Sequence, residues 1–136
     1  NYTVSLNSNC TLSTFLDQYT YSGGAHGSTI RSSVSWNLNT GEPLTIQNLL
    51  PEITNPMETI IDHIIQMADS QSKSDSLYFP DYQVLIRNTF KMNQFYLSPK
   101  TIIFYFQEYD IAPYAGGIME FHIPYEDLNI NPPSCV

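Results

Sequence analysis

The sequence predicts an α+β fold, in which a mainly antiparallel sheet is covered on one face by one long helix and a short second helix. Several short segments alternate between apolar and polar residues, as half-buried strands do. Residues 56–69 instead repeat apolar side chains at helical spacing. The links between neighbouring strand segments are short, which favours antiparallel pairing and a helix packed on one side of the sheet.

Three strands are expected before the long helix. Residues 2–8 alternate strictly between apolar and polar types, and residues 12–21 are rich in Thr, Phe and Tyr, which favour strands. Residues 28–38 place their apolar side chains on one face. The glycine-rich stretch 22–27 is expected to connect the second and third strands, and residues 39–43 are expected to form a turn.

The long helix is expected to begin at Asn55, whose side chain can cap it. Pro56 suits the first helical position, and Glu58 has the acidic side chain that a capping box requires. The apolar residues that follow are Met57, Ile60, Ile61, Ile64, Ile65 and Ala68. Their spacing forms a wide apolar stripe, which predicts that this helix buries one face against the sheet.

A short helix and three strands are expected in the C-terminal half. Asp81 can cap a helix over residues 81–87. Residues 95–97 and 101–106 flank a Ser-Pro-Lys turn, which is the pattern of a β-hairpin. A last strand is expected over residues 118–125, followed by a proline-containing tail.

The length of 136 residues fits one compact domain, so we expect a single domain over residues 1–136. The chain opens without Met, directly on a strand pattern, and we therefore expect it to be truncated at its N-terminus from a longer protein. No run of about 18 apolar residues occurs, so we expect no direct membrane contact from this segment.

Charge is sparse and acidic: 5 Lys and Arg oppose 13 Asp and Glu, for a net charge of −8. A nucleic-acid partner would need basic side chains to neutralise phosphates, so no nucleic-acid partner is expected. An anionic membrane surface would repel the chain for the same reason. A basic protein or a cation would be attracted. The alternative is that the acidic balance serves solubility alone.

The two cysteines, Cys10 and Cys135, lie near opposite ends of the chain. Because chain termini often lie close together at a domain surface, we expect a disulfide between them. Such a bridge would close a loop of more than about 100 residues and stabilise the fold by about 4–5 kcal/mol. A disulfide fits an oxidising compartment, which favours an extracytoplasmic location. Two free thiols are the alternative.

Two loops are candidate binding elements. The first contains Ser22 and His26 among three glycines, and such a loop can present His26 to a partner. The second places Tyr114 between Pro113 and two glycines, and a tyrosine on a stiffened loop makes a good interface anchor. The alternatives are a purely structural turn for the first loop and an inward-packed plug for the second.

Signals for catalysis and metal binding are weak. Glu120 and His122 share one face of a predicted strand and, together with His26, could form a metal site. Glu108 and Asp110 could be a carboxylate pair for glycoside chemistry. Solvated or hydrogen-bonded polar side chains are the default explanation of both patterns. Because the sequence also lacks a serine-nucleophile elbow and a reactive-cysteine signature, we expect no enzyme, no metal site and no cofactor.

A string of motifs across residues 12–128 resembles the RsiV-type extracytoplasmic domain, which is DUF3298-like. The motifs are Tyr21-Ser-Gly-Gly-Ala-His-Gly27, Leu38-Asn-Thr-Gly41 with Leu44 and Asn48-Leu-Leu50, Phe95-Tyr-Leu97, Ile103-Phe-Tyr-Phe106, Tyr109-Asp-Ile-Ala-Pro-Tyr-Ala-Gly116 and Phe121-His-Ile-Pro-Tyr125. Each motif alone is unspecific, whereas the combination is specific.

The resemblance implies a non-catalytic α+β binding module of a bacterial envelope or secreted protein. In a lysozyme-sensing anti-sigma factor, a domain of this kind binds lysozyme, which is strongly basic. By resemblance, the partner-binding role falls on Ser22 and His26 in the first loop and on Pro113 and Tyr114 in the second. The alternatives are a cell-wall-associated hydrolase and a polysaccharide-binding module. The anti-sigma segment is not part of this sequence, so no signalling role is implied.

Overall fold

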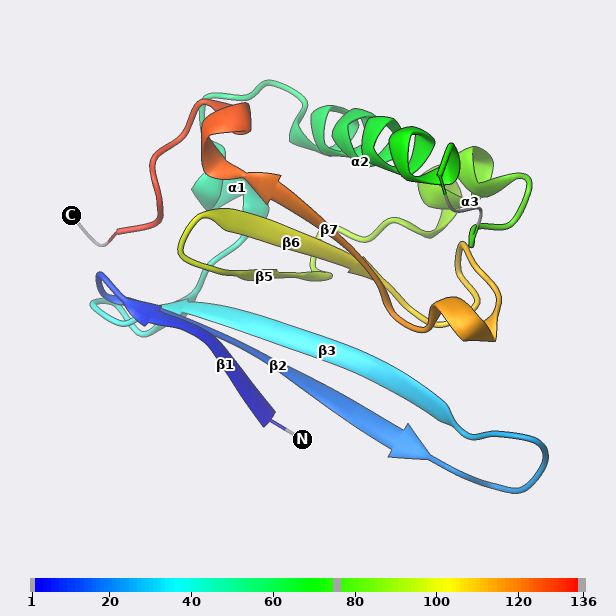
Figure 1. The fold of residues 1–136 in the computed structure, drawn as a ribbon. Helices are drawn as coiled ribbons and strands as arrows, with labels where there is room; N and C mark the ends of the chain where they lie inside the picture. Colours follow the sequence, from blue (N-terminus) through cyan, green and yellow to red (C-terminus); the bar gives the residue numbers. More distant parts are fainter. Residues whose placement is uncertain (1, 75–76, 135–136) are drawn as a thin grey trace.

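Helices, a C-terminal sheet and an N-terminal sheet form three successive layers (Figure 1). The computed structural model describes residues 2–74 and 77–134. Within them, the long helix lies across one face of the C-terminal sheet, and the N-terminal sheet lies on the other side. The α+β class predicted from the sequence is confirmed. The expected single sheet is instead divided into two.

The N-terminal sheet has the strand order β1-β2-β3-β4 with antiparallel neighbours. Its strands are β1 (Tyr2–Ser8), β2 (Thr11–Thr20), β3 (Ser28–Asn37) and β4 (Glu42–Pro43). The first three strands were predicted to within one residue at either end. The two residues of β4 lie where a turn was expected, and they pair with the end of β3.

The C-terminal sheet has the order β5-β6-β7, again antiparallel. Its strands are β5 (Phe95–Leu97), β6 (Thr101–Phe106) and β7 (Met119–Pro124), which confirms the predicted hairpin and last strand. In β6, every residue after Thr101 is buried. A strand with this continuous apolar run needs cover on both faces. The division into two sheets supplies it, because the helices cover one face and the N-terminal sheet covers the other.

The helical segments are α1 (Ile46–Leu49), α2 (Pro56–Ser72), α3 (Tyr82–Thr89) and the 3-10 turns η1 (Tyr114–Gly116) and η2 (Tyr125–Leu128). Asn55 caps α2 as predicted, since its side chain accepts a hydrogen bond from the Glu58 N–H. The Glu58 carboxylate does not complete a capping box. It pairs with Arg87 of α3 at 2.7 Å and so ties the two helices together.

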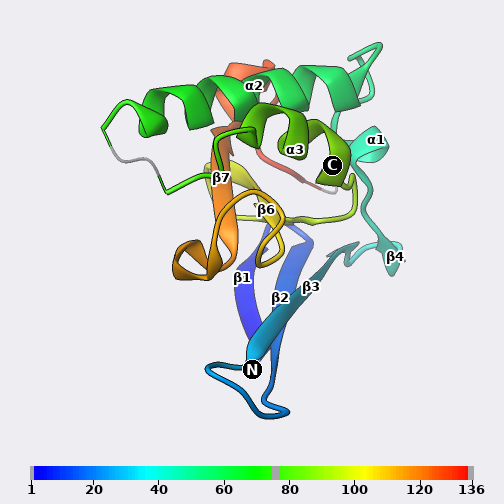
Figure 2. The ribbon, with the colours of Figure 1, turned by 90° about the vertical axis from the view of Figure 1, so that its right-hand side faces the viewer.

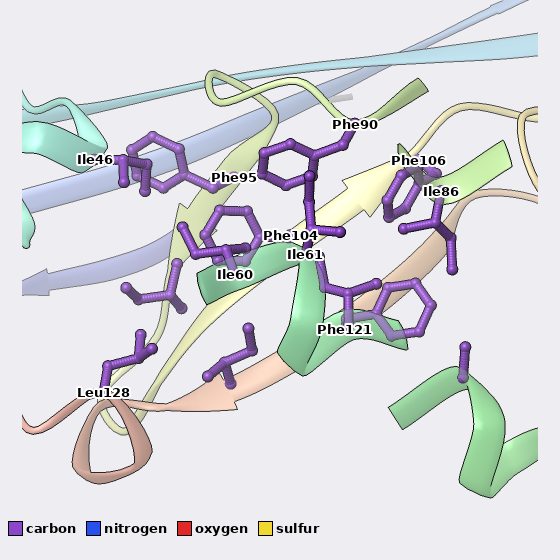
Figure 3. Packing of buried hydrophobic residues seen from close by; sticks show 14 of the residues in the cluster. Ile46, Ile60, Ile61, Ile86, Phe90, Phe95, Phe104, Phe106, Phe121 and Leu128 are labelled. Carbon is purple, nitrogen blue, oxygen red and sulfur yellow. The ribbon is translucent and has the colours of Figure 1, made fainter. Parts of the chain in front are cut away.

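The main core lies between α2 and the C-terminal sheet (Figure 3). The predicted stripe supplies Ile60, Ile61, Ile64 and Ala68, all buried, whereas Met57 at the start of the helix is exposed. Figure 3 shows Ile60 and Ile61 against the rings of Phe104 and Phe121, which come from β6 and β7. Burial of these large side chains fixes α2 on the sheet.

The interface between the N-terminal and C-terminal sheets, which we call the joint, is more polar than the main core. Tyr96, Ile103 and Tyr105 form a small buried cluster there. Around it, the Ser13 hydroxyl accepts a hydrogen bond from the Leu97 N–H at 2.8 Å, and the Ser33 hydroxyl donates to the Phe95 carbonyl at 2.6 Å. The N-terminal sheet is therefore positioned by specific hydrogen bonds as well as by apolar contact.

Gln107 replaces a neighbouring strand along part of the β3 edge. Its Oε1 accepts a hydrogen bond from the Arg31 N–H at 2.9 Å, and its Nε2 donates to the Arg31 carbonyl at 2.7 Å. The same Nε2 donates to Gln94 Oε1 at 2.8 Å. The side-chain amide thus satisfies both backbone groups of Arg31, which an open sheet edge would leave unpaired.

We expect Gln107→Ala to lower the free energy of unfolding by about 2–3 kcal/mol, because it removes both partners of the Arg31 backbone in a half-buried place. Urea denaturation measures this loss. Gln47→Ala is the matched control, since Gln47 is exposed on α1 and should change stability by less than about 0.5 kcal/mol. Equal losses in the two variants would mean that water replaces the amide without cost.

Candidate binding surface

The β2–β3 hairpin projects past the C-terminal sheet, and its loop forms the tip (Figures 1 and 2). Gly23 and Gly24 have φ angles of 106° and 103°, a backbone region open to glycine but strained for other residues. The Tyr21 hydroxyl donates to the Gly24 carbonyl at 2.9 Å and holds the loop closed. Positive φ angles therefore explain two of the glycines in this loop.

Gly27 is needed for a different reason, namely close packing. A Cβ atom at this position would lie 2.5 Å from the ring of Tyr19 and 2.6 Å from the Thr20 carbonyl oxygen. No rotation of a side chain relieves a clash with backbone. Gly27 is buried under Tyr19, and this contact fixes how the chain leaves the loop and enters β3.

The second loop is anchored in the core on one side and turned outward on the other. Ile111 and Ala112 are buried, and the Ile111 carbonyl accepts a hydrogen bond from the Phe79 N–H at 2.9 Å. Pro113 then starts the turn η1, where its carbonyl accepts from the Gly116 N–H at 2.9 Å. Pro113 is exposed and Tyr114 is half-buried.

The structure brings the two predicted loops together. The imidazole of His26 stacks on the ring of Tyr114, with a centroid distance of 3.7 Å and an interplanar angle of 12°. Ser22, in the same loop as His26, is exposed, as is Pro113 beside Tyr114. The four residues singled out in the sequence therefore lie on two touching loops. Tyr114 does not plug the core, which was the alternative for its loop.

Three further residues complete this surface and were not predicted as binding residues, although Glu108 was considered as half of a carboxylate pair. The ring of Tyr109 lies 6.0 Å from that of Tyr114, and its side chain is 49% exposed. Tyr19, which is 63% exposed, covers Gly27. Glu108 precedes Tyr109 and bonds to β3. We call Tyr19, His26, Glu108, Tyr109 and Tyr114 the aromatic surface.

The backbone conformation of Tyr109 explains why no sequence pattern indicated it as a binding residue. Its φ angle is 69°, which is unusual for a bulky residue. The strained turn is held at both ends, because Asp110 Oδ2 accepts from the Gln107 N–H and the Asp110 N–H donates to the Gln107 carbonyl, each at 3.1 Å. No local pattern predicts such a tyrosine, since aromatic residues avoid this conformation.

Glu108 places a negative charge within the aromatic surface. Its Oε1 accepts a hydrogen bond from the Thr29 N–H at 2.8 Å, and Thr29 is the strand partner of Tyr19. Partial burial raises the pKa of Tyr114, and the nearby charge of Glu108 raises it further. Tyr114 is therefore a neutral hydrogen-bond donor and acceptor at physiological pH.

Beside this surface, Arg31 links the two sheets through carboxylates. Its guanidinium bonds to Asp17 through Nε at 2.7 Å and Nη2 at 2.9 Å, and it also bonds to Glu120 of β7. The same group lies 4.4 Å above the ring of Phe15. Burial alone would raise the pKa of Glu120, but hydrogen bonds, of which that from Tyr96 is the largest, lower it overall.

The residues weighed for metal binding separate in the structure. Glu120 and His122 share a face as predicted, with His122 Nε2 at 3.3 Å from Glu120 Oε1. His26 instead stacks on Tyr114. Across residues 2–74 and 77–134, no group of three His, Cys, Asp or Glu side chains is placed to hold a metal ion.

The two carboxylates considered for glycoside chemistry, Glu108 and Asp110, both accept hydrogen bonds from backbone N–H groups. Glu108 accepts from the Thr29 N–H, and Asp110 accepts from the Gln107 N–H.

A separate open cleft of about 440 Å³ between α2 and β7 is lined by His63 and His122, among others. His63 uses Nδ1 to contact the Thr59 carbonyl at 2.9 Å within its own helix.

The predicted disulfide cannot be followed to its second cysteine. Cys10 lies at the β1–β2 turn, where its carbonyl accepts a hydrogen bond from the Leu38 N–H at 2.8 Å. Cys135 lies outside the described residues, so the pairing stays a prediction.

The described helices include none with the length and apolar character that crossing a bilayer requires.

Comparison with known proteins gives both a family and related folds. Residues 48–126, more than half of the chain, match the family "Protein of unknown function (DUF3298)". A crystal structure of a DUF3298 family member from Bacteroides fragilis NCTC 9343 is similar over 98% of this chain and 53% of its own, with a TM-score of 0.71 and 26% identity.

A DUF3298 family protein from Pseudomonas aeruginosa PAO1 has the same TM-score of 0.71 at 21% identity, over 94% of this chain and 58% of its own. At that identity the likeness concerns the fold alone. The present chain thus spans little more than half the length of either solved relative. Among proteins with curated descriptions, none matches the chain.

Proposed function

The chain belongs to the DUF3298 family, and on that premise we propose that it is a non-catalytic, extracytoplasmic module that binds a basic protein. Lysozyme is the most specific candidate for this partner. The protein carrying it would be secreted, or held at the cell surface through a segment outside this sequence. The stacking of His26 on Tyr114 is the observation that carries the proposal, because it joins both candidate loops into one exposed surface.

The build of the aromatic surface suits binding. Tyrosines bring large contact area and lose little conformational entropy when they are immobilised. Tyr109 and Tyr114 lie on a loop that is held by hydrogen bonds and by the core anchor at Ile111, and Tyr19 lies at the end of β2, packed over Gly27. A surface that is ordered before the partner arrives loses less entropy on binding.

The charge of the chain favours a basic partner over an acidic one. A net charge of −8 attracts a cationic protein and accelerates its encounter at low salt. Lysozyme satisfies this requirement and is the ligand implied by the resemblance of the two loops to the RsiV-type domain. The engagement of Glu108 and Asp110 by backbone N–H groups further supports binding over catalysis.

We expect Tyr114→Ala to weaken lysozyme binding by about 30-fold or more, the effect of losing an interface anchor of about 2 kcal/mol. Isothermal titration calorimetry at low salt measures the change. Tyr2→Ala is the control, because Tyr2 is an exposed tyrosine on β1, outside the aromatic surface, and should leave the affinity unchanged. An absence of heat when lysozyme is added to the wild-type chain at micromolar concentration would reject lysozyme as the partner.

Exposed tyrosine rings also favour a second candidate, a wall polysaccharide, since sugar rings stack on aromatic faces. Tyr19, Tyr21 and Tyr109 are all exposed around the hairpin tip. Titration with soluble peptidoglycan fragments distinguishes the two candidates. Saturable heat with the glycan and none with lysozyme would replace the protein partner with a carbohydrate.

A further inference from the structure

We propose that the aromatic surface receives a guanidinium or ammonium group of its partner, which lies on the exposed ring of Tyr109, beside the edge of Tyr114, and pairs with the carboxylate of Glu108. This inference rests on the proposed binding function and adds the chemical group that is recognised. An aromatic face attracts a cation through the negative charge of its π system, and a nearby carboxylate adds a charge-assisted hydrogen bond.

The chain of contacts that brings Glu108 to the tyrosines runs through β3. Tyr19 and Thr29 are direct partners across the β2–β3 hairpin. The Thr29 N–H donates to Glu108 Oε1 at 2.8 Å, so the carboxylate is held at the level of Tyr19. Tyr109 follows Glu108 directly, and its ring lies 6.0 Å from that of Tyr114. The acid and the rings therefore border one patch.

The charge of Glu108 has no cationic partner within the described chain. The ion pairs formed among residues 2–74 and 77–134 involve Asp17, Glu58, Asp62 and Glu120 as the acids. Glu108 uses one oxygen for a neutral backbone N–H. A carboxylate held beside exposed rings and not neutralised by the protein itself is suited to an external cation.

Tyr109 combines a strained backbone conformation with an exposed ring. With φ at 69°, this residue occupies a region that costs on the order of 1–3 kcal/mol for a non-glycine residue. Despite this cost, its side chain remains 49% exposed, so burial of the ring does not compensate for the strain. Strained residues of this kind cluster at functional sites, and a binding role for the exposed ring accounts for the strain.

The molecule already contains one cation held in this way. The Arg31 guanidinium lies 4.4 Å from the centroid of the Phe15 ring while bonding to the carboxylate of Asp17. Aromatic faces and an acid thus accommodate a guanidinium inside this fold. The aromatic surface repeats that combination at the exterior, where it is open to a partner.

The test uses the whole chain and a capped Gly-Arg-Gly peptide as the probe. NMR titration should give saturable shifts of the Tyr109 and Tyr114 ring signals. A Gly-citrulline-Gly peptide, equal in shape but uncharged, should bind about 10-fold more weakly, the loss of about 1.4 kcal/mol expected when one cation–π and charge contact disappears. Lysozyme is not needed for this measurement.

Glu108→Gln, compared with a charge removal elsewhere, tests whether the peptide is attracted by the carboxylate at residue 108 or by the net charge of the chain. The amide oxygen keeps the acceptor for the Thr29 N–H, so the surface should stay folded, as its unperturbed NMR spectrum away from residue 108 will show. We expect about a 10-fold loss of affinity for the arginine peptide. Glu52→Gln removes the same charge from an exposed position on another loop. It should change the affinity by less than about 2-fold, because long-range attraction is screened at moderate salt.

Three outcomes would overturn the inference: no shifts of the Tyr109 and Tyr114 signals with the arginine peptide, equal binding of the citrulline peptide, or equal losses in Glu108→Gln and Glu52→Gln. Failure of the cation site can be told apart from failure of the proposed lysozyme binding. Peptide binding without lysozyme binding rejects lysozyme and keeps the cation site. Lysozyme binding without peptide binding keeps the module and rejects the cation site.

Discussion

Replacing Arg31 with methionine is expected to lower the free energy of unfolding by about 3 kcal/mol. The Arg31 side chain is only 12% exposed, and its removal leaves the carboxylates of Asp17 and Glu120 in a half-buried joint without their shared cation. The loss lies at the lower end for buried ion pairs because both carboxylates remain about a third exposed to water. Urea denaturation at pH 7 measures it.

Arg87→Met is the matched control. Arg87 joins α2 and α3 through Glu58 and Asp62, but its ion pairs are exposed to solvent, so its removal should cost much less than that of Arg31. If the two variants lost the same stability, the Arg31 joint would contribute no more than a surface ion pair. The two sheets would then be held together mainly by the apolar cluster around Tyr96 and Tyr105.

The difference between wild type and Arg31→Met should depend on pH. Burial acts to raise the pKa of Glu120, but the hydrogen bonds from Tyr96, His122 and Arg31 outweigh it, so the folded-state pKa is lowered. A lowered pKa stabilises the fold above the unfolded-state pKa, and this contribution disappears as the pH falls through the folded-state value. The stability difference between the two proteins should therefore shrink as the pH falls below the unfolded-state glutamate pKa of about 4.3.

Phe104→Ala is expected to lower the free energy of unfolding by about 3–5 kcal/mol. Phe104 is 0% exposed, and its ring lies 5.8 Å from that of Phe90 and 6.2 Å from that of Phe95. Truncation removes the transfer free energy of the ring and leaves a cavity between β6 and α2 (Figure 3).

Phe104→Leu fills most of that cavity and should recover at least about half of the loss. Thermal or urea denaturation of both variants tests this order. Phe104 lies on the helix side of the C-terminal sheet, so the folded fraction of each variant should bind the arginine peptide with wild-type affinity. Equal stabilities of the alanine variant and the wild type would contradict a closely packed core at this position.

The secondary structure followed from the sequence because its signals are local. The alternation in β1 and the cap at Asn55 each involve residues within a few positions of one another. The same reasoning missed α1, whose capping box of Thr45 and Asn48 lies in a segment with little periodicity. It also merged two sheets into one, because strand pairing between distant segments has no local signal.

The candidate loops were identified by glycine and proline, which restrict the backbone wherever they occur. That local rule pointed to His26 and Tyr114 but not to their contact. Glu108 and Tyr109 were missed as binding residues because one depends on a hydrogen bond from Thr29 and the other on a left-handed turn held by Asp110. Both depend on how β6 meets β3.

The sequence by itself determined the α+β class, most strands, the long helix and the two loops, because hydrophobic period and turn chemistry act between near neighbours. Only the tertiary structure decided that the strands separate into two layers, that Gln107 and Arg31 join them, and that the two loops meet. These contacts link residues far apart in the chain, and their geometry is set by packing around β6, which buries both of its faces.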